Sequence, residues 1–399
     1  MKLKIKLQLS SMMFLQFFIW GVWYVTMGTY LIKIGFDGLN IGAAYSTINW
    51  GAIISPFVIG MIADRFFSAE RVLGIMHLTG GVILYILIQI TDPATFFWTL
   101  LVYALLYMPT LALVNTICFN QMTDTKNEFP RIRVLGTLGW ITSGLLIGWM
   151  KIEDSSMVFQ IGAAASILLG IYSFFLPSTP PQSKGQSPTI RDILGLDALA
   201  LLKDRNFAVF IVCSLLISIP LAFYYSFTNP FLNEVGMENA AGKMTLGQGS
   251  EFLFLLLMPF FFSRLGVKKM LLIAMLAWIT RYLFFAYGNN EELVPLLYMG
   301  IILHGICYDF FFVTGQIYVD QAAPKKIKAS AQGFITLITY GLGMLIGSWA
   351  AGWFVKQYTL ANGNHLWQSI WLIPAGMALI ATLLFLTLFS EKKKVSVEN

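Results

Sequence analysis

Charged residues are scarce in this sequence. Asp, Glu, Lys and Arg together make up 12% of the 399 residues, whereas hydrophobic residues make up 57%. Soluble globular chains carry about 25% charged and about 45–50% apolar residues. The composition therefore excludes an ordinary soluble protein and indicates a chain that exposes apolar side chains to lipid.

Cysteine and histidine are also rare, with three residues of each. Cys118, Cys213 and Cys307 lie in apolar runs and form no C-x-x-C pair, and the histidines are equally scattered. An odd number of cysteines in apolar runs argues against a disulfide framework, and zinc sites need clustered ligands. We expect neither a metal nor any other cofactor.

Motifs of soluble chemistry are missing as well. The sequence has no P-loop, no GxGxxG that opens a Rossmann unit, no HExxH and no GxSxG. We therefore expect no enzyme, and any uphill transport must draw on an ion gradient or on the solute's own gradient. An intramembrane enzyme with Glu251 and Asp309 as acid and base is a remote alternative, and a channel is disfavoured because central acids are few.

Apolar runs of roughly 20 residues recur along the chain, the length a helix needs to cross about 30 Å of hydrocarbon. The first run follows several lysines, but it is too long for a signal peptide and lacks a small-residue cleavage site. One long polar segment, residues 178–205, separates two sets of runs. The predicted spans are residues 8–32, 41–63, 71–90, 94–118, 131–150, 157–177, 206–232, 244–263, 269–288, 293–321, 328–356 and 366–390.

This pattern predicts an all-α polytopic membrane protein with twelve transmembrane helices. We expect two pseudo-symmetric six-helix bundles, residues 1–177 and 206–399, joined by a cytoplasmic linker at residues 178–205. The charged turn at residues 60–71 is echoed at residues 263–269, a repeat typical of transporters built from related bundles. The first turn resembles a signature of the major facilitator superfamily, although Phe66 and Phe67 stand where a glycine is usual.

Positive charge sets the expected orientation. If the N-terminus is cytoplasmic, most of the 26 Lys and Arg residues fall on the inner side. The outer side receives only Lys33, Lys151, Lys243 and Lys356, and Arg281 lies within a span. Both termini are therefore expected in the cytoplasm, and the net charge of +6 requires no nucleic-acid partner.

Ionisable residues inside a span are functional candidates, because a charge at the bilayer centre costs about 2.5–3.5 kcal/mol on insertion scales. Glu251 lies about 20 Å of helix from Arg264, which marks the inner interface. Gln248 shares its helix face at i,i+3 spacing. An acid beside an amide could bind a hydroxylated or heterocyclic solute and carry a proton; the alternative is a structural bond between helices.

Asp309 also lies deep within a span, with His304 and Tyr308 on the adjacent stripe of the same helix. An acid beside aromatic rings could bind a solute ring and titrate, or it could tie two helices together. Arg281 falls in the ninth span, where outer-layer packing would place it away from a central cavity. We interpret Arg281 as a structural or snorkelling residue and leave it out of the site.

Three further helix faces mix polar groups with rings. Arg133, Thr137 and Trp140 fall at i, i+4 and i+7, although the sequence alone favours Arg133 as another inner-side positive charge. Such a face could line a cavity or pack against neighbouring helices. The sequence does not distinguish between these two roles. The other two faces are Gln16, Trp20, Trp23 and Met27, and Ser218, Ala222, Tyr225 and Asn229.

The chain resembles the nucleoside:proton symporter family of the major facilitator superfamily along its whole length. The motifs that carry the resemblance include residues 20–30, 107–116, 129–137, 194–198, 277–288, 309–311 and 329–333. The resemblance implies import of nucleosides with protons by alternating access, in a multi-pass protein of the cell (inner) membrane that acts as a monomer. The family's binding positions match Arg133, Thr137, Trp140, Gln248, Glu251 and Asp309.

Two positions depart from the family pattern. Tyr225, with Ala222 one turn earlier, stands where relatives can offer an amide pair, and His304 stands where a tyrosine may occur. We expect the nucleoside base to stack on Trp140 or Tyr308, and Glu251 or Asp309 to carry the proton. A carrier of the same fold for a sugar or another neutral polyol is the nearest alternative.

Overall fold

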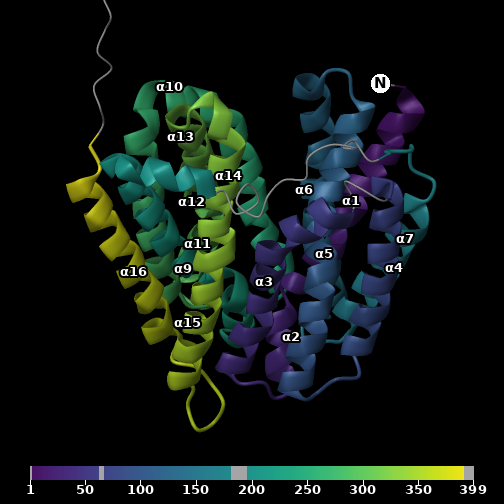
Figure 1. The fold of residues 1–399 in the computed structure, drawn as a ribbon. Helices are drawn as coiled ribbons and strands as arrows, with labels where there is room; N and C mark the ends of the chain where they lie inside the picture. The colour runs from purple at the N-terminus through teal and green to yellow at the C-terminus, as the bar shows by residue number, and fades with distance from the viewer. Residues whose placement is uncertain (1, 63–66, 181–195, 391–399) are drawn as a thin grey trace, which may run out of the picture.

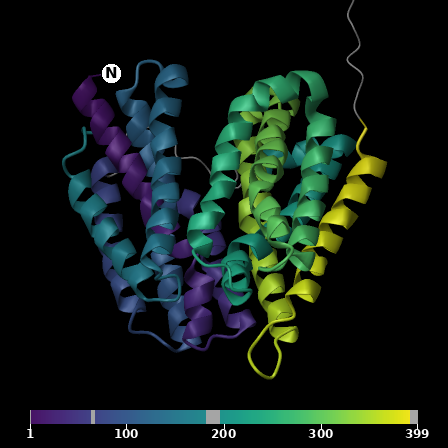
Figure 2. The same cartoon turned by 180° about the vertical axis from the view of Figure 1, so that it is seen from behind.

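The computed structural model describes residues 2–62, 67–180 and 196–390, and these are helical almost throughout. The predicted charged turn at Asp64-Arg65 and most of the predicted linker lie outside the described residues. The all-α prediction is confirmed, since the described ranges contain no strand beyond one isolated bridge between Thr359 and His365. The helices form two groups, one built from the first part of the chain and one from the second (Figures 1 and 2).

The first group holds the helices that precede the polar segment. Their bounds are α1 Leu3–Tyr24, α2 Met27–Lys33, α3 Gly38–Ile62, α4 Ala69–Leu87, α5 Pro93–Gln121, α6 Thr125–Met150 and α7 Met157–Ser173. Asp92 caps α5, because its carboxylate accepts hydrogen bonds from the Thr95 hydroxyl and the Thr95 backbone N–H, at 2.7 and 2.8 Å. These bonds hold the pKa of Asp92 below its usual range.

The second group begins with a 3₁₀ turn and contains two π-helical segments, η2 and η4. Its bounds are η1 Leu196–Lys203, α9 Arg205–Glu234, α10 Ala240–Tyr287, α11 Val294–Ile302, α12 His304–Tyr308, η2 Asp309–Val313, α13 Thr314–Ala322, η3 Lys325–Ile327, α14 Lys328–Thr336, η4 Leu337–Gly343, α15 Met344–Gln357 and α16 Trp367–Leu388. Single-turn π segments are frequent at functional sites.

The element α10, Ala240–Tyr287, contains two of the predicted spans. Residues 244–263 and 269–288 form two helices on either side of a kink in this element. Gly266 interrupts it with φ 68° and ψ 178°, a conformation open essentially to glycine alone. The chain therefore changes direction at Gly266 within one or two residues.

The outer surface of the molecule is apolar. Trp149 is 78% exposed, Phe175 70% and Leu256 64%, and many other large apolar side chains are also exposed. In the described part of the chain, nine helices are long and apolar enough to cross a membrane, and α7 is apolar but shorter. Such a surface suits a lipid environment, so the chain is a multi-pass membrane protein.

The two groups of helices meet at the end of the molecule opposite the N-terminus and diverge towards the N-terminal end (Figures 1 and 2). At the meeting end α3 crosses α15 through small residues, so that a Cβ on Gly352 would lie 2.5 Å from the carbonyl oxygen of Gly38. Lys356 pairs with Asp37 at 2.8 Å across the same contact.

A buried carboxylate closes the contact between the groups. Glu153, between α6 and α7, is only 6% exposed and accepts hydrogen bonds from the Asn229 and Asn233 amides at 2.7 and 2.9 Å. Its other oxygen accepts the backbone N–H of Ala241 at 3.0 Å, in the first turn of α10. An anion at a helix N-terminus satisfies free N–H groups and the helix dipole, so Glu153 seals this end.

Candidate substrate-binding cavity

A cavity of about 320 Å³ lies between the two groups of helices. This size is within the range of small-molecule sites, and apolar and aromatic walls with a few polar groups are typical of them. Both groups contribute to its wall. The lining residues are Phe17, Trp20, Tyr24, Ile48, Asn49, Ala52, Met108, Leu111, Arg133, Thr137, Trp140, Tyr225, Gln248, Glu251, Tyr308, Thr336, Tyr340 and Met344.

Helix α6 presents Arg133, Thr137 and Trp140 to the cavity on one face, as their spacing predicts. The guanidinium of Arg133 lies 4.1 Å from the ring centroid of Phe17 on α1, a cation–π contact that holds it in place. This approach depends on Gly136, where a Cβ would lie 2.6 Å from the Phe17 ring. Close packing of α1 on α6 therefore orients a positive charge on the cavity wall.

Trp140 belongs to an aromatic cluster with residues of α1. Its ring meets Trp20 edge-on at 5.5 Å and Tyr24 at 6.3 Å between centroids. Tyr24 also contacts Tyr225 of α9 at 5.8 Å, so the cluster bridges both groups of helices. Edge-to-face pairs at these distances stabilise ring orientation, and they leave Trp140 facing the cavity.

The opposite wall carries Gln248 and Glu251, one turn apart on α10. The Glu251 side chain is 29% exposed, so it is open to the cavity. Arg133 and Glu251 interact electrostatically across the cavity, although they come from different groups of helices. The cavity therefore places one cation and one acid on facing walls.

Two tyrosines join the helices of the second group at the cavity wall. The hydroxyls of Tyr308 and Tyr340 lie 2.5 Å apart, and both side chains line the cavity. Tyr308 ends α12 where η2 begins, and Tyr340 lies within η4. Both π segments therefore position a phenol for hydrogen bonding to a ligand.

Seven of the nine predicted site residues line the cavity, and two lie behind its wall. His304 and Asp309 are each 1% exposed. His304 Nε2 is 3.7 Å from a carboxylate oxygen of Glu251, so His304 lies directly behind the Glu251 side chain. Asp309 Oδ2 has no hydrogen-bond partner among the described residues.

The other predicted polar faces separate into cavity and packing roles. Trp20 and Tyr225 line the cavity. Gln16 instead bonds Thr110 and His77 inside the first group, at 2.7 and 2.8 Å. Asn229 belongs to the Glu153 contact, and Ala222 packs against Gly347 of α15.

Sequence reasoning missed four polar residues of the wall: Tyr24, Asn49, Thr336 and Tyr340. Tyr24 neighbours the predicted α1 face but lies one residue outside its stripe. Asn49 of α3 could have been noticed in the sequence, because it is an amide within an apolar run. In the structure it is buried, and its amide donates a hydrogen bond to the Ser348 hydroxyl of the second group at 3.2 Å. Tyr340 lies in a π-helical segment, where the 3.6-residue period does not hold.

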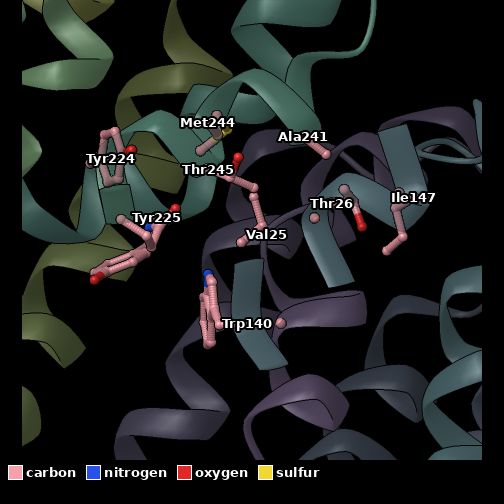
Figure 3. A pocket seen from close by; sticks show the side chains of 12 residues that line it. Val25, Thr26, Trp140, Ile147, Tyr224, Tyr225, Ala241, Met244 and Thr245 are labelled. Carbon is pink, nitrogen blue, oxygen red and sulfur yellow. The ribbon is translucent and has the colours of Figure 1, made fainter. Parts of the chain in front are cut away.

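A smaller pocket of about 20 Å³ lies beside the main cavity (Figure 3). Trp140, Tyr225 and Gln248 line both spaces, and Met244 and Thr245 line only the smaller one. Because the N-terminal turn of α10 borders it through Ala241, the smaller pocket lies between the cavity and the Glu153 seal. In the described ranges no group of three His, Cys, Asp or Glu residues could hold a metal ion.

Known proteins resemble this chain along nearly its whole length. The family model described as "Nucleoside H+ symporter" matches residues 1–394. The chain is 45% identical to YegT of Escherichia coli (strain K12), over 98% of this chain and 95% of that protein. It is 36% identical to the nucleoside permease NupG of the same organism, over 98% and 97% of the two chains. A crystal structure of the nucleoside transporter NupG superposes with a TM-score of 0.91 and covers 97% of this chain and 100% of that one.

Proposed function

Since the chain belongs to the nucleoside H⁺ symporter family, and is thus a secondary transporter that couples nucleosides to protons, we propose that the cavity between its two groups of helices binds the nucleoside. The observation that carries the proposal is the placement of Arg133 and Glu251 on facing walls of this cavity, beside the ring of Trp140. A nucleoside offers what this wall can recognise: a flat base, ring heteroatoms and ribose hydroxyls. The family assignment also favours a nucleoside over the sugar or polyol alternative.

Each wall has a role in this proposal. The base stacks on Trp140 or Tyr308, which present ring faces from the two sides. Arg133, Thr137 and Gln248 donate hydrogen bonds to acceptors on the base or the ribose, and Glu251 accepts one from a hydroxyl or ring N–H. Tyr225 adds a ring and a hydroxyl where relatives can offer amides.

The proton acts through Glu251 and Asp309. Glu251 is open to the cavity, so it exchanges protons with the water that enters there. A proton on Glu251 removes its attraction to Arg133 and frees the guanidinium for the nucleoside, which couples the two binding events. Asp309, buried without a bond to Oδ2, is a second site where a proton would neutralise a charge removed from water.

Alternating access then involves the two groups as units. We propose twelve spans in two bundles, residues 1–177 and 206–399, with the linker and both termini on the cytoplasmic side of the inner membrane. The bias of Lys and Arg supports this orientation. Because the groups meet at the opposite end, this conformation is open to the cytoplasm and closed to the outside. We also propose that the protein acts as a monomer.

The proposal is tested by Glu251→Gln in proteoliposomes, with exposed Glu291→Gln as the matched control. Labelled uridine uptake is measured under an inward proton gradient, and uridine exchange is measured without one. We expect the Glu251→Gln protein to stop accumulating uridine, so that the ratio of internal to external uridine concentration falls to about 1, because the amide carries no proton. Uridine exchange by this variant should be retained. Accumulation by Glu251→Gln at the level of Glu291→Gln would show that Glu251 does not couple protons.

A further inference from the structure

Arg281 is a buried cation without an anionic partner. Its side chain is 0% exposed, and no carboxylate of the described residues lies within ion-pair distance of it. The guanidinium carbon lies 3.4 Å from the ring centroid of Tyr224, and Nη1 lies 3.2 Å from His304 Nδ1. Nε and Nη2 have no hydrogen-bond partner in the described part of the chain. Burial of an uncompensated charge is costly, so the position requires an explanation.

The contact with Arg281 fixes the hydrogen on His304. An arginine side chain has donors only, so Nδ1 of His304 must accept, and the ring hydrogen is on Nε2. A second hydrogen on Nδ1 would face another donor at 3.2 Å and set two cations side by side. Stacking on Tyr224, with centroids 5.1 Å apart and planes at 20°, holds the ring in this orientation. His304 therefore stays neutral and always offers the same hydrogen.

The nitrogen that carries this hydrogen, Nε2, is the one that lies near Glu251. Nε2 is 3.7 Å from Oε2 of Glu251, beyond hydrogen-bond distance but within reach of a small rotation of that side chain. Arg281, His304 and Glu251 are thus arranged in series, with the imidazole between the guanidinium and the carboxylate. A hydrogen bond from His304 would transmit the attraction of Arg281 to Glu251, since linked bonds polarise each other.

We propose that Arg281 and His304 are positioning residues that hold the Glu251 carboxylate in the unloaded transporter after the proton has left. This inference rests on the proposed proton-coupling role of Glu251. When the empty protein returns to its outward-facing state, the cavity closes around an ionised Glu251, which then needs a positive partner. Arg133 belongs to the other group of helices, whereas Arg281 and His304 move together with Glu251.

Other groups near Glu251 do not supply this charge. Those that act on it electrostatically are hydroxyls, another acid or Arg133 on the opposite wall, and none brings a cation from the second group. They are Arg133 on α6, Tyr224 and Tyr225 on α9, Tyr308 at the end of α12, Asp309 in η2 and Tyr340 in η4.

Three variants test the inference. His304→Gln can accept from Arg281 and donate to Glu251, whereas His304→Phe keeps the stacked ring but does neither. Arg281→Lys keeps the charge. The matched control is His365→Phe, which removes a histidine–carboxylate pair with Glu234, 2.6 Å apart, outside the cavity. Uridine exchange and net uptake under a proton gradient are measured in proteoliposomes, at several internal pH values.

We expect His304→Phe to keep exchange, which needs only the loaded, protonated transporter, and to lose net uptake by about tenfold or more. Net uptake by this variant should recover as the internal pH is raised, because proton release no longer has help from Arg281. His304→Gln and Arg281→Lys should stay within about threefold of the unmodified protein, and His365→Phe should match it.

Two results would overturn the inference while leaving the function of Glu251 intact. The first is full net uptake by His304→Phe at every pH, with Glu251→Gln unable to accumulate uridine in the same assay. The second is loss of net uptake by His304→Gln with exchange retained, which would make His304 a proton carrier itself. Full accumulation by Glu251→Gln would instead remove the premise and reject both proposals.

Discussion

At the scale of single residues, the cavity combines few charges with many rings. Trp140 is oriented by Trp20 and Tyr24 before any ligand arrives, so little ordering is needed when a base stacks on it. Tyr308 and Tyr340 hold each other's hydroxyls on the other wall. Rings fixed in this way bind any flat heterocycle, and the polar groups beside them then select among heterocycles.

Removal of the Trp140 ring should weaken nucleoside binding. Stacking of a base on an aromatic side chain contributes about 1–3 kcal/mol, so Trp140→Ala should raise the KM for uridine by about tenfold or more. Trp140→Phe keeps a ring and should raise it by less than about threefold. The matched control is Leu138→Ala on the 47%-exposed lipid side of the same helix. An unchanged KM in Trp140→Ala would exclude stacking at this position.

At the residue scale, helix periodicity predicts which side chains share a face. The spacing of Arg133, Thr137 and Trp140, and of Gln248 and Glu251, predicts two such faces, and in the structure these side chains line the cavity. The same reasoning does not predict how far a side chain lies from the cavity. His304 is one turn from Tyr308, yet it lies behind the cavity wall because the rings of Tyr224 and Tyr225 pack around it. Which side chain occupies the first layer depends on neighbouring helices, and one helix's sequence does not contain that information.

At the scale of helices, two irregularities matter most. Gly266 turns α10 sharply within the short charged segment that the sequence predicts as a turn. The π segments η2 and η4 rotate the chain beyond Tyr308 and around Tyr340. The π segments arise from packing between helices, so a regular hydrophobic period in the sequence does not reveal them.

The Glu153 contact should keep the outer end closed. Glu153→Gln loses the charge that faces the first turn of α10 and part of the bonding to Asn229 and Asn233. We expect the equilibrium to shift towards the outward-open state by severalfold, since a carboxylate at a helix N-terminus contributes about 0.3–2 kcal/mol. A cysteine at Met244, in the smaller pocket, should then react faster with an impermeant thiol reagent added from outside.

The neighbouring acid provides the control for this experiment. Asp154 pairs with Lys33 at 3.4 Å within the first group of helices and is half exposed. Asp154→Asn, carried with the same Met244→Cys change, should leave the labelling rate unchanged. Equal labelling rates in the Glu153→Gln and Asp154→Asn proteins would show that Glu153 does not hold the outer end closed.

At the scale of the whole molecule, composition and the pattern of apolar runs proved to be the strongest predictors. Few charges and repeated apolar runs predict a helical membrane protein, and the exposed apolar surface of the two helix groups is what that prediction requires. The relative placement of the groups could not be predicted, because alternating access gives one sequence more than one stable arrangement. The contacts of Glu153, Asp37 and Gly352 show which arrangement this is.

The measurement that tests the account most directly is uptake of labelled uridine into proteoliposomes, with and without an inward proton gradient. The account predicts accumulation of unchanged uridine above the external concentration only with the gradient, with competition by unlabelled nucleosides and none by free ribose. Equal uptake in both conditions would contradict proton coupling. Competition by ribose as strong as that by nucleosides would contradict recognition of the base by Trp140 and the surrounding wall.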